Sequence, residues 1–553
     1  MMANWTERIP GTDRVRAIAL GFLVALVAGP IFGKGLVAQE DAAILFRYSE
    51  NVANGFGIVY NPGGEKVDGA TDLPFMWVLA FFNQLGVSTT VAAVAVSAIS
   101  TGVVAALIYL AWCKWSGLGG FWALLPVAFL MAGPVWAYGM AGFGTLFFAA
   151  SCAALAFAAE MASDRASTRR LLILGALATV CGLARPEGFL LAGAVIAFLS
   201  LRLRSWRFLL VPLAVIIPAG VMWVAWRWSY FGYPLPNPFY KKGGGRLYID
   251  GLTTSVSYVV RLTYIFMLPV LASLVVRQVR SRAVTICLVV FTWTSIWVLL
   301  SNEMNFVGRF QFGVVPVIAI MSAPLIPALR KSVVEANWTW LPNAKTVGIA
   351  MLVTLLVLLG WTVRQEAKPS LGRLVADQAN LNFGIHENLS AALAASGQPG
   401  KVAVSEAGYV AWKSGWLTTD LWGLNDKQIA HEGFLSEQQL AELRPEVVFT
   451  HLCYDNGPKF SAVGEAPCIQ GWSEMTDPLV CFVSSQKYKT AGYWVDSRNH
   501  AWAVFVDSRS KRAKSLAQAI SAIDAGADPI QGERRINVAG KVAIPQPTSC
   551  ATI

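Results

Sequence analysis

The chain has 553 residues, of which 55% are hydrophobic and 14% are charged, and its mean hydropathy is +0.51. A soluble protein of this length could not keep so much apolar surface from water, so the composition excludes that class and predicts a polytopic α-helical membrane protein. The net charge of +11 does not indicate nucleic acid, because the basic residues lie largely in short loops between apolar segments.

Apolar runs along the chain predict about eleven membrane spans. They are residues 15–36, 89–112, 121–137, 141–160, 171–184, 187–201, 207–229, 256–276, 283–300, 311–329 and 346–363. Segment 73–86 has about fourteen apolar-rich residues, which are too few to cross a hydrocarbon core comfortably. We predict that this segment is a helix along the membrane surface.

Positive charge in the loops predicts the orientation of the chain. With the N-terminus inside, the basic loops at residues 114, 165–170, 202–207, 277–282 and 330–331 also fall inside. The C-terminal region then lies on the outer face. The first span has no small-x-small cleavage site, so we expect it to remain as an anchor.

The first outer loop begins with two adjacent carboxylates, Glu40 and Asp41. Their repulsion and partial desolvation cost free energy, which a catalytic role, a metal ion or a cation such as Arg47 would offset. An acidic loop in solvent and an N-cap for the next helix are the alternatives. An amphipathic stretch at residues 42–52 and a glycine-rich turn at residues 54–57 follow, so we expect an ordered loop.

Most of the later outer loops also carry charged residues. Charges at membrane depth normally face a cavity rather than lipid, so the sequence predicts one polar cavity that opens outward. Arg185 and Glu187 lie in a turn between two short spans, where they could equally pair with each other alone.

Three cations of the last outer loops are candidate phosphate ligands. Lys241 and Lys242 break the positive-inside pattern, and they could bind anionic lipid headgroups or the phosphate of a lipid-linked substrate. Arg309 could bind a phosphate through two hydrogen bonds, or it could form an ion pair with Glu303.

The sequence divides into a transmembrane region, residues 1–363, and a less hydrophobic outer domain, residues 364–553. Segments 402–408 and 446–452 have the pattern of short buried strands, and a capping box at Ser436 indicates a helix start, so the predicted class of this domain is α/β.

Cysteine and tryptophan residues add two expectations for this domain. Two disulfides are expected in an oxidising compartment among Cys453, Cys468, Cys481 and Cys550, with Cys453–Cys468 as the first pairing to test. The cysteines of the membrane region are expected to be packing residues: Cys113, Cys152, Cys181 and Cys287. Three tryptophans of this domain could stack on sugar rings, fill the domain core or rest on the membrane interface: Trp412, Trp416 and Trp422.

Several motifs occur in order along the chain. Glu40-Asp41 is followed by Phe-Arg-Tyr at residues 46–48 and Asn-Pro-Gly at residues 61–63. Later stretches read Arg-Pro-Glu-Gly at residues 185–188, YFGYPLPNPFYK at residues 230–241, Gly-Arg-Phe at residues 308–310 and DLWGLND at residues 420–426. Together they resemble the outer motifs of the GT-C glycosyltransferases, in particular the branch typified by the mycobacterial terminal β-(1→2) arabinofuranosyltransferase.

The resemblance implies a GT-C fold and a periplasmic C-terminal domain in a bacterial inner membrane. It implies transfer of one sugar, arabinofuranose in the named branch, from a polyprenyl-phosphate donor to a glycan or glycolipid acceptor. The reaction would invert the configuration of the anomeric carbon, and the protein would contact membrane lipids. We expect Asp41 to be the catalytic base with Glu40 assisting, although their order alone leaves the choice between them open. No cofactor is required and no metal ligand is predicted, while a carboxylate-bound divalent cation is compatible with the loop.

The remaining site residues follow from the same motifs. Donor-phosphate or substrate binding is expected for Arg47, Arg185, Glu187, Asn237, Tyr240, Lys241, Lys242 and Arg309. Acceptor binding is expected for Trp412, Trp416 and Trp422. The chain departs from the family at Glu40, where an aspartate is frequent, and at Gly144, where a glutamate is frequent, so the sugar stays open.

A transporter or flippase of a polyprenyl-linked sugar is the competing function. It would need charges on both faces and broken helices near the midplane of the membrane. The polar residues of this chain gather on one face, which favours the enzyme. The sequence contains no Walker loop and no H-E-x-x-H motif.

Overall fold

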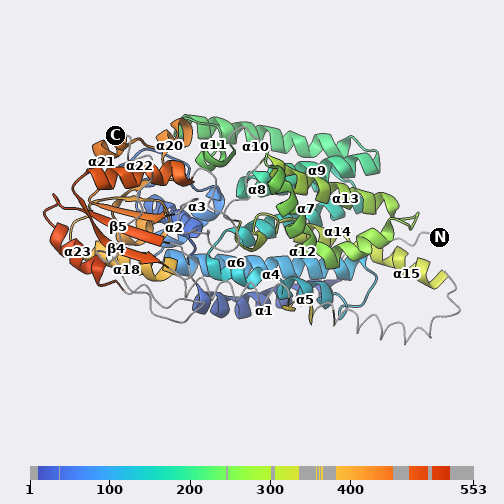
Figure 1. The fold of residues 1–553 in the computed structure, drawn as a ribbon. Helices are drawn as coiled ribbons and strands as arrows, with labels where there is room; N and C mark the ends of the chain where they lie inside the picture. Colours follow the sequence, from blue (N-terminus) through green and yellow to red (C-terminus); the bar gives the residue numbers. More distant parts are fainter. Residues whose placement is uncertain are drawn as a thin grey trace.

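A computed structural model describes residues 10–36, 38–243, 247–299, 305–335, 381–452, 472–495 and 501–523, with isolated positions between 357 and 364. Long helices lie side by side in a bundle, and a smaller domain with a β-sheet covers one end of it (Figure 1). The polytopic helical part and the C-terminal α/β part are both as predicted.

The helices of the bundle follow the predicted apolar runs. Seven of the described helices are long and apolar enough to cross a membrane. Helices α5 and α6 meet at an angle of 54° and would add an eighth if the bent pair is one span rather than a re-entrant loop. Two helices of 17 residues, α8 and α9, occupy the other predicted positions. The bounds are α1 Gly11–Gly35, α4 Thr89–Trp115, α5 Leu124–Ala132, α6 Val135–Ala141, α7 Thr145–Asp164, α8 Thr168–Ala184, α9 Glu187–Leu203, α10 Arg207–Phe231, α12 Ile249–Ser273, α13 Arg280–Ser295, α14 Val314–Met321 and α15 Ile326–Glu335. The eleventh predicted span, residues 346–363, lies almost entirely outside the described residues.

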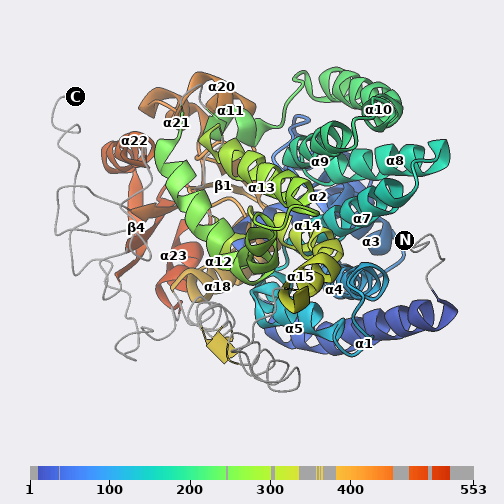
Figure 2. The same cartoon turned by 90° about the vertical axis from the view of Figure 1, so that its right-hand side faces the viewer.

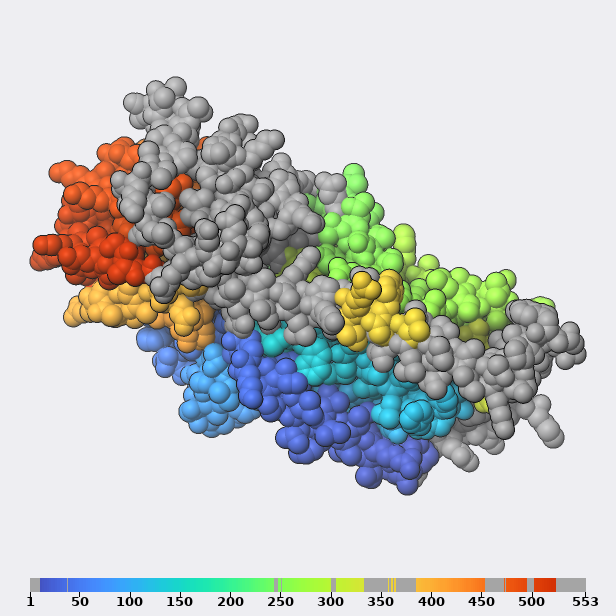
Figure 3. Space-filling view, turned by 60° about the horizontal axis from the view of Figure 1, so that its bottom comes forward, coloured from blue at the N-terminus to red at the C-terminus, as the bar shows by residue number. Residues whose placement is uncertain are grey.

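Large apolar side chains cover the outside of the bundle. Ile18 and Phe22 of α1 are about 70% exposed, and Val221 and Met222 of α10 are similarly exposed. Seen along the bundle, α1 and α10 both lie at its periphery (Figure 2), and Figure 3 shows α1 uncovered along its length. Faces of this kind need an apolar solvent, which a bilayer supplies.

The basic loops gather at one end of the bundle. Lys114 lies 3.4 Å from Asp164, and Arg282 pairs with the fully buried Glu160. Arg202 donates to Ser163 across the same end. Since positive loops mark the inner face of a membrane protein, the opposite end, which carries the sheet domain, is the outer face in the orientation that the sequence predicts (Figure 1).

Three short helices lie at the end next to the sheet. They are α2 Glu40–Ala53, α3 Leu73–Gln84 and α11 Asn237–Gly243. The predicted short helix at residues 73–86 is therefore confirmed as a helix. Asp41 lies in the first turn of α2, where the positive end of the helix dipole favours a carboxylate. Asp68, in the loop after α2, pairs at 2.6 Å with Arg227 at the end of α10, and both side chains are buried.

The C-terminal domain is a five-stranded sheet between two layers of helix. The strand order is β2-β1-β3-β5-β4, with β1, β2 and β3 parallel and β5 antiparallel to both of its neighbours. One face packs on α18, α19 and α23, and the other packs on α21 and α22. The strands are β1 Lys401–Val404, β2 Leu417–Asp420, β3 Val447–Leu452, β4 Tyr488–Val495 and β5 Ala501–Asp507. The helices are α18 Leu381–Ala395, α19 Tyr409–Ser414, α20 Lys427–Glu432, α21 Glu437–Leu443, α22 Trp472–Ser485 and α23 Ala513–Ser521. Both predicted strands and the capping box at Ser436 are confirmed.

The first outer loop and the C-terminal domain share one apolar core. Phe46 of α2 and Phe75 of α3 belong to the same buried cluster as Phe449 of β3. Within it, the ring of Phe46 meets that of Trp412 edge to face at 5.1 Å. The helix that carries Asp41 is therefore packed directly against the sheet domain.

Arg47 joins the two parts through hydrogen bonds rather than facing a substrate. Its guanidinium donates to the carbonyl oxygens of Tyr60, Ala411 and Trp416 and to the side chain of Asn61. The structure therefore places Arg47 in a structural role, contrary to the expected substrate contact, because carbonyls of the docked domain supply its partners.

Replacing Arg47 by alanine should destabilise the protein by about 2–4 kcal/mol, because buried carbonyls would lose their donors. Thermal unfolding in detergent measures this loss. Arg16→Ala is the matched control, since the Arg16 side chain is 64% exposed and pairs only with Asp13 among the described residues. Equal stability of the two variants would show that Arg47 does not hold the parts together.

Candidate active site

A cavity of about 350 Å³ lies where the outer loops meet the C-terminal domain. Its polar walls carry three carboxylates and three cations. They are Asp41, Asp72, Glu187, Arg185, Lys242 and Arg309. Five of these six were predicted as site residues, and the structure brings them together from four separate loops.

Asp41 and Arg309 form an ion pair in this cavity. Burial raises the pKa of Asp41, but the nearby positive charges, chiefly Arg309 and Lys242, lower it by more than burial raises it. The net result is a pKa below the ordinary value of an aspartate. Asp41 is therefore an ionised carboxylate at neutral pH and can accept a proton. Arg309 also lies over the ring of Phe143, 4.0 Å from its centroid.

Arg185 is held between two carboxylates. Its Nε lies 3.0 Å from Glu187 Oε1 and 3.3 Å from Asp72 Oδ1. Its guanidinium also lies over the rings of Phe148 and Phe310, at 5.6 and 5.3 Å from their centroids. The predicted pairing of Arg185 with Glu187 is present, and both side chains line the cavity.

Asp72 is the site residue that sequence reasoning missed. It precedes α3 at the N-cap position, yet its carboxylate makes no capping hydrogen bond and turns to Arg185 instead. A Cβ on Gly144 would lie 2.6 Å from Asp72 Oδ2. Asp72 thus occupies the space that a side chain at position 144 would fill, and the glycine at that position was the available signal.

The rest of the cavity wall is apolar. Trp297 and Phe310 stack with ring planes at 10° and centroids 5.3 Å apart. Other apolar residues that line the cavity include Leu190, Leu235, Phe239, Ile296 and Leu299. A polar end with cations and an apolar wall suit a ligand with a phosphate and a hydrocarbon chain.

Neighbouring lysines on α11 point to different places. Lys242 lines the cavity. Lys241 lies over the rings of Phe434 and Trp422 in the C-terminal domain, with its Nζ 3.5 Å and 4.9 Å from their centroids. The two lysines that were expected to face one phosphate are therefore separated, and only Lys242 lines the cavity.

Asn237 and Tyr240 also turn to the C-terminal domain. The Asn237 amide donates to the carbonyl oxygens of Gly423, Leu424 and Asp426. Tyr240 packs on the ring of His431, with centroids 4.4 Å apart. Neither side chain is among those that line the cavity, so the structure gives them a docking role in place of the expected substrate contact.

Glu40 faces away from the cavity that Asp41 lines. Its carboxylate accepts hydrogen bonds from the backbone amides of Gly408 and Tyr409 at 2.7 and 3.0 Å, and it lies 2.6 Å from Nδ1 of His386. Successive side chains on a helix point about 100° apart, and here only the carboxylate of Asp41, not that of Glu40, lines the cavity.

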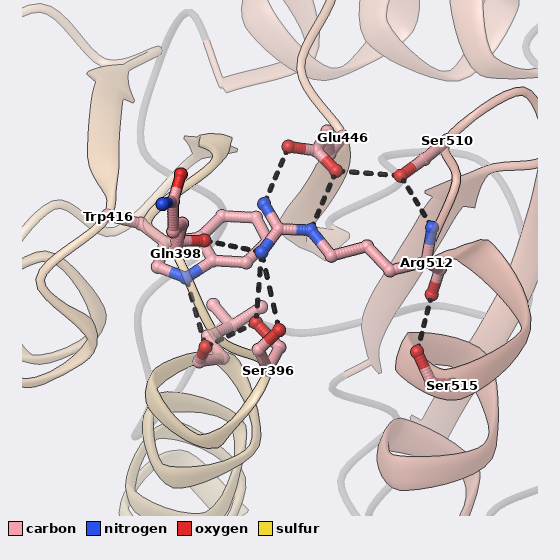
Figure 4. Close-up of polar contacts among 8 residues, drawn as sticks. Ser396, Gln398, Trp416, Glu446, Ser510, Arg512 and Ser515 are labelled. Atoms are coloured by element: carbon pink, nitrogen blue, oxygen red, sulfur yellow. Dashed lines mark hydrogen bonds and ion pairs between the residues drawn. The ribbon is translucent and has the colours of Figure 1, made fainter.

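The three tryptophans do not form a free stacking surface. Trp416 is 1% exposed, its Nε1 donates to Leu393 O, and its ring packs under the guanidinium of Arg512 (Figure 4). Trp412 is buried and donates to Glu50. Trp422 is half-buried beneath Lys241. The alternative, that they fill the core, fits Trp412 and Trp416.

The cysteines follow the predicted division. Cys113, Cys152, Cys181 and Cys287 are free. Cys481 is disulfide-bonded. The other three candidates, Cys453, Cys468 and Cys550, lie outside the described residues, as does Glu303.

Comparison with known proteins gives a match to a family profile and a likeness to solved structures. A family profile described as "Domain of unknown function (DUF8728)" matches residues 375–505. No curated protein matches the sequence. Two crystal structures of ArnT from Cupriavidus metallidurans are similar, one bound to undecaprenyl phosphate and one in the apo state. Each has a TM-score of 0.53, identities are 13% and 14%, and each match covers 88% of this chain and 97% of ArnT.

The chain has the GT-C fold. This is the fold that the resemblance of the loop motifs implied. The coverage of 88% includes most of the bundle and of the C-terminal domain, so the two parts belong to one architecture.

Proposed function

We propose that the protein is a GT-C glycosyltransferase that moves one sugar from a polyprenyl-phosphate donor to a glycan or glycolipid acceptor at the outer face of a bacterial inner membrane. The observation that carries this proposal is the cavity itself. It joins one ionised carboxylate, Asp41, to the cations Arg309 and Lys242 and to an apolar wall. The similar ArnT structure with bound undecaprenyl phosphate supports a donor of this chemical class.

The cations would bind the donor phosphate. Arg309 and Lys242 are positioned to share its charge, and charge-assisted hydrogen bonds of this kind are strong where water is excluded. The polyprenyl chain would lie along Trp297 and Leu299. Arg309 pairs with Asp41 here, so the phosphate would compete for Arg309 and release Asp41 for catalysis.

Asp41 would act as the general base. The acceptor hydroxyl oxygen attacks the anomeric carbon, the bond from that carbon to the phosphate oxygen breaks, and Asp41 takes the hydroxyl proton. Polyprenyl phosphate leaves with the bonding electron pair, stabilised by Arg309 and Lys242. A single displacement inverts the anomeric centre. Arabinofuranose is the first sugar to test, because the loop motifs resemble that branch.

Cleavage of the donor separates this function from a transporter. We expect purified protein in proteoliposomes to release polyprenyl phosphate from polyprenyl-phosphate arabinofuranose in the presence of an acceptor glycan. Thin-layer chromatography of the labelled donor measures this release. Movement of intact donor between leaflets without cleavage would instead establish a flippase.

The C-terminal domain should be accessible to membrane-impermeant reagents added outside the cell. A cysteine in place of the exposed Gln518 in α23 should react with an impermeant maleimide in intact cells, above the labelling of the parent protein. A cysteine in place of Arg204, in a basic loop at the other end, should react only after permeabilisation. The reverse pattern would overturn the orientation.

A further inference from the structure

A histidine is enclosed by two glutamates where the C-terminal domain meets α2. Glu40 begins α2, His386 lies in α18, and Glu406 lies in the loop between β1 and α19. This loop follows β1, whose neighbour β3 runs parallel to it, so the group lies at the carboxyl edge of the two strands. The three residues come from distant parts of the chain and meet only because the domain docks on α2.

The geometry of the group is close to that of a metal site. One ligand atom from each residue lies within 4.8 Å of the others. His386 Nδ1 is 2.6 Å from Glu40 Oε1, and His386 Nε2 is 3.5 Å from Glu406 Oε2. Ligand atoms around a tetrahedral Zn²⁺ lie about 3.3 Å apart, since each bond is about 2.0–2.2 Å long. One ion takes only one nitrogen of His386, so the carboxylate that faces the other nitrogen would have to turn toward the ion.

An independent observation points to a ligand. His386 is 1% exposed, and its Nε2 has no hydrogen-bond partner although it faces Glu406. Buried polar atoms are nearly always satisfied, so this nitrogen needs either a proton shared with Glu406 or an ion.

We propose that Glu40, His386 and Glu406 bind one divalent transition-metal ion, Zn²⁺ or Mn²⁺. Imidazole nitrogen with carboxylate oxygen suits these ions, whereas Mg²⁺ and Ca²⁺ prefer oxygen ligands alone. The site is distinct from the cavity, which Glu40 does not line. This inference does not rest on the proposed sugar transfer.

The surroundings of the group would hold its ligands in place. The second oxygen of Glu40 accepts from the amides of Gly408 and Tyr409, and Glu406 Oε1 lies 3.5 Å from His451 Nδ1. A Cβ on Gly408 would lie 2.0 Å from Glu40 O. The loop therefore approaches α2 so closely that only glycine fits at position 408. Such outer contacts orient metal ligands in known sites.

The ion would fasten the C-terminal domain to the first turn of α2. Because Asp41 follows Glu40 directly, the ion would also fix the backbone that presents Asp41 to the cavity. Glu40, His386 and Glu406 are thus positioning residues rather than catalytic ones.

Metal content of the untagged, full-length protein tests the proposal. After chelator treatment and dialysis against Zn²⁺ or Mn²⁺, we expect about one tightly held ion per chain by mass spectrometry and a higher unfolding temperature with the ion than without it. Glu406→Gln and His386→Gln should lower the affinity at least tenfold and remove the thermal shift. His386→Cys should restore binding of Zn²⁺, because a thiolate is also a zinc ligand.

Two carboxylate variants serve as matched controls. Glu446→Gln removes a carboxylate of the same domain that pairs with Arg512, and Asp72→Asn removes one from the cavity. Both should keep the ion. Absence of a bound ion in the parent protein, or equal binding by Glu406→Gln and parent, would show that His386 is a proton-bearing bridge only. Loss of the ion in Asp72→Asn alone would assign it to the cavity and overturn the proposal.

Discussion

Replacing Asp41 by asparagine should abolish sugar transfer, with a loss of about 10²–10⁴ in rate. The amide keeps the shape of the side chain but cannot accept the hydroxyl proton. Donor binding should persist or tighten, because Arg309 would no longer be paired with a carboxylate. Initial rates with saturating donor, together with the dissociation constant of polyprenyl phosphate, separate these two effects.

Glu65→Gln is the matched control for this experiment. Glu65 lies in the same outer loop, its side chain is 55% exposed, and it is 3.8 Å from Lys427. Its amide variant should transfer sugar at the normal rate. Full activity of Asp41→Asn would remove Asp41 from the reaction.

Replacing Lys242 by alanine should weaken polyprenyl-phosphate binding about 10–100-fold, because a charge-assisted hydrogen bond of about 1.5–3 kcal/mol would be lost. Arg309→Ala should have a larger effect, since it also leaves the charge of Asp41 uncompensated beside the phosphate. Arg309→Lys should restore part of the affinity, because lysine keeps the charge but not the two-pronged geometry. Titration with labelled polyprenyl phosphate in detergent measures each constant.

Lys241→Ala gives this prediction its sharpest control. It removes the same charge from the next residue of α11, but that lysine lies over Phe434 and Trp422. We expect less than a threefold change in donor affinity. Equal losses of donor affinity in Lys241→Ala and Lys242→Ala would indicate nonspecific electrostatic attraction by surface charge rather than a specific phosphate-binding site.

The fold could be predicted largely from the sequence, because membrane spans depend on the length and apolarity of a segment. The short segment at residues 73–86 was separated from the spans by length alone, and it forms α3. Alternation of apolar strands with a capped helix likewise indicated the α/β domain. None of these inferences required knowledge of which residues touch.

The site could be predicted only in part, because side-chain direction depends on helical phase and on what docks against each loop. Lys241 and Lys242 have the same chemistry in sequence, yet α11 turns only Lys242 to the cavity. Arg47 looked like a phosphate ligand, but carbonyls of the docked domain satisfy it. Two of its partners, the carbonyls of Ala411 and Trp416, lie more than 350 residues away in the chain, where no local pattern reveals them.

The same reason explains why the group at Glu40 was not predicted. His386 and Glu406 lie on separate elements of a domain whose docking face has no signature in the sequence. All four histidines of the sequence lie in the C-terminal domain, so the sequence offers no histidine ligand within the membrane region. The structure instead brings a histidine of the outer domain to the first residue of α2.

A structure of the protein with bound polyprenyl phosphate tests the central claim most directly. We expect the phosphate between Lys242 and Arg309, the hydrocarbon chain along Trp297, and the carboxylate of Asp41 released from Arg309 and open to an acceptor hydroxyl. A phosphate bound outside this cavity, with the Asp41–Arg309 pair intact, would contradict the account.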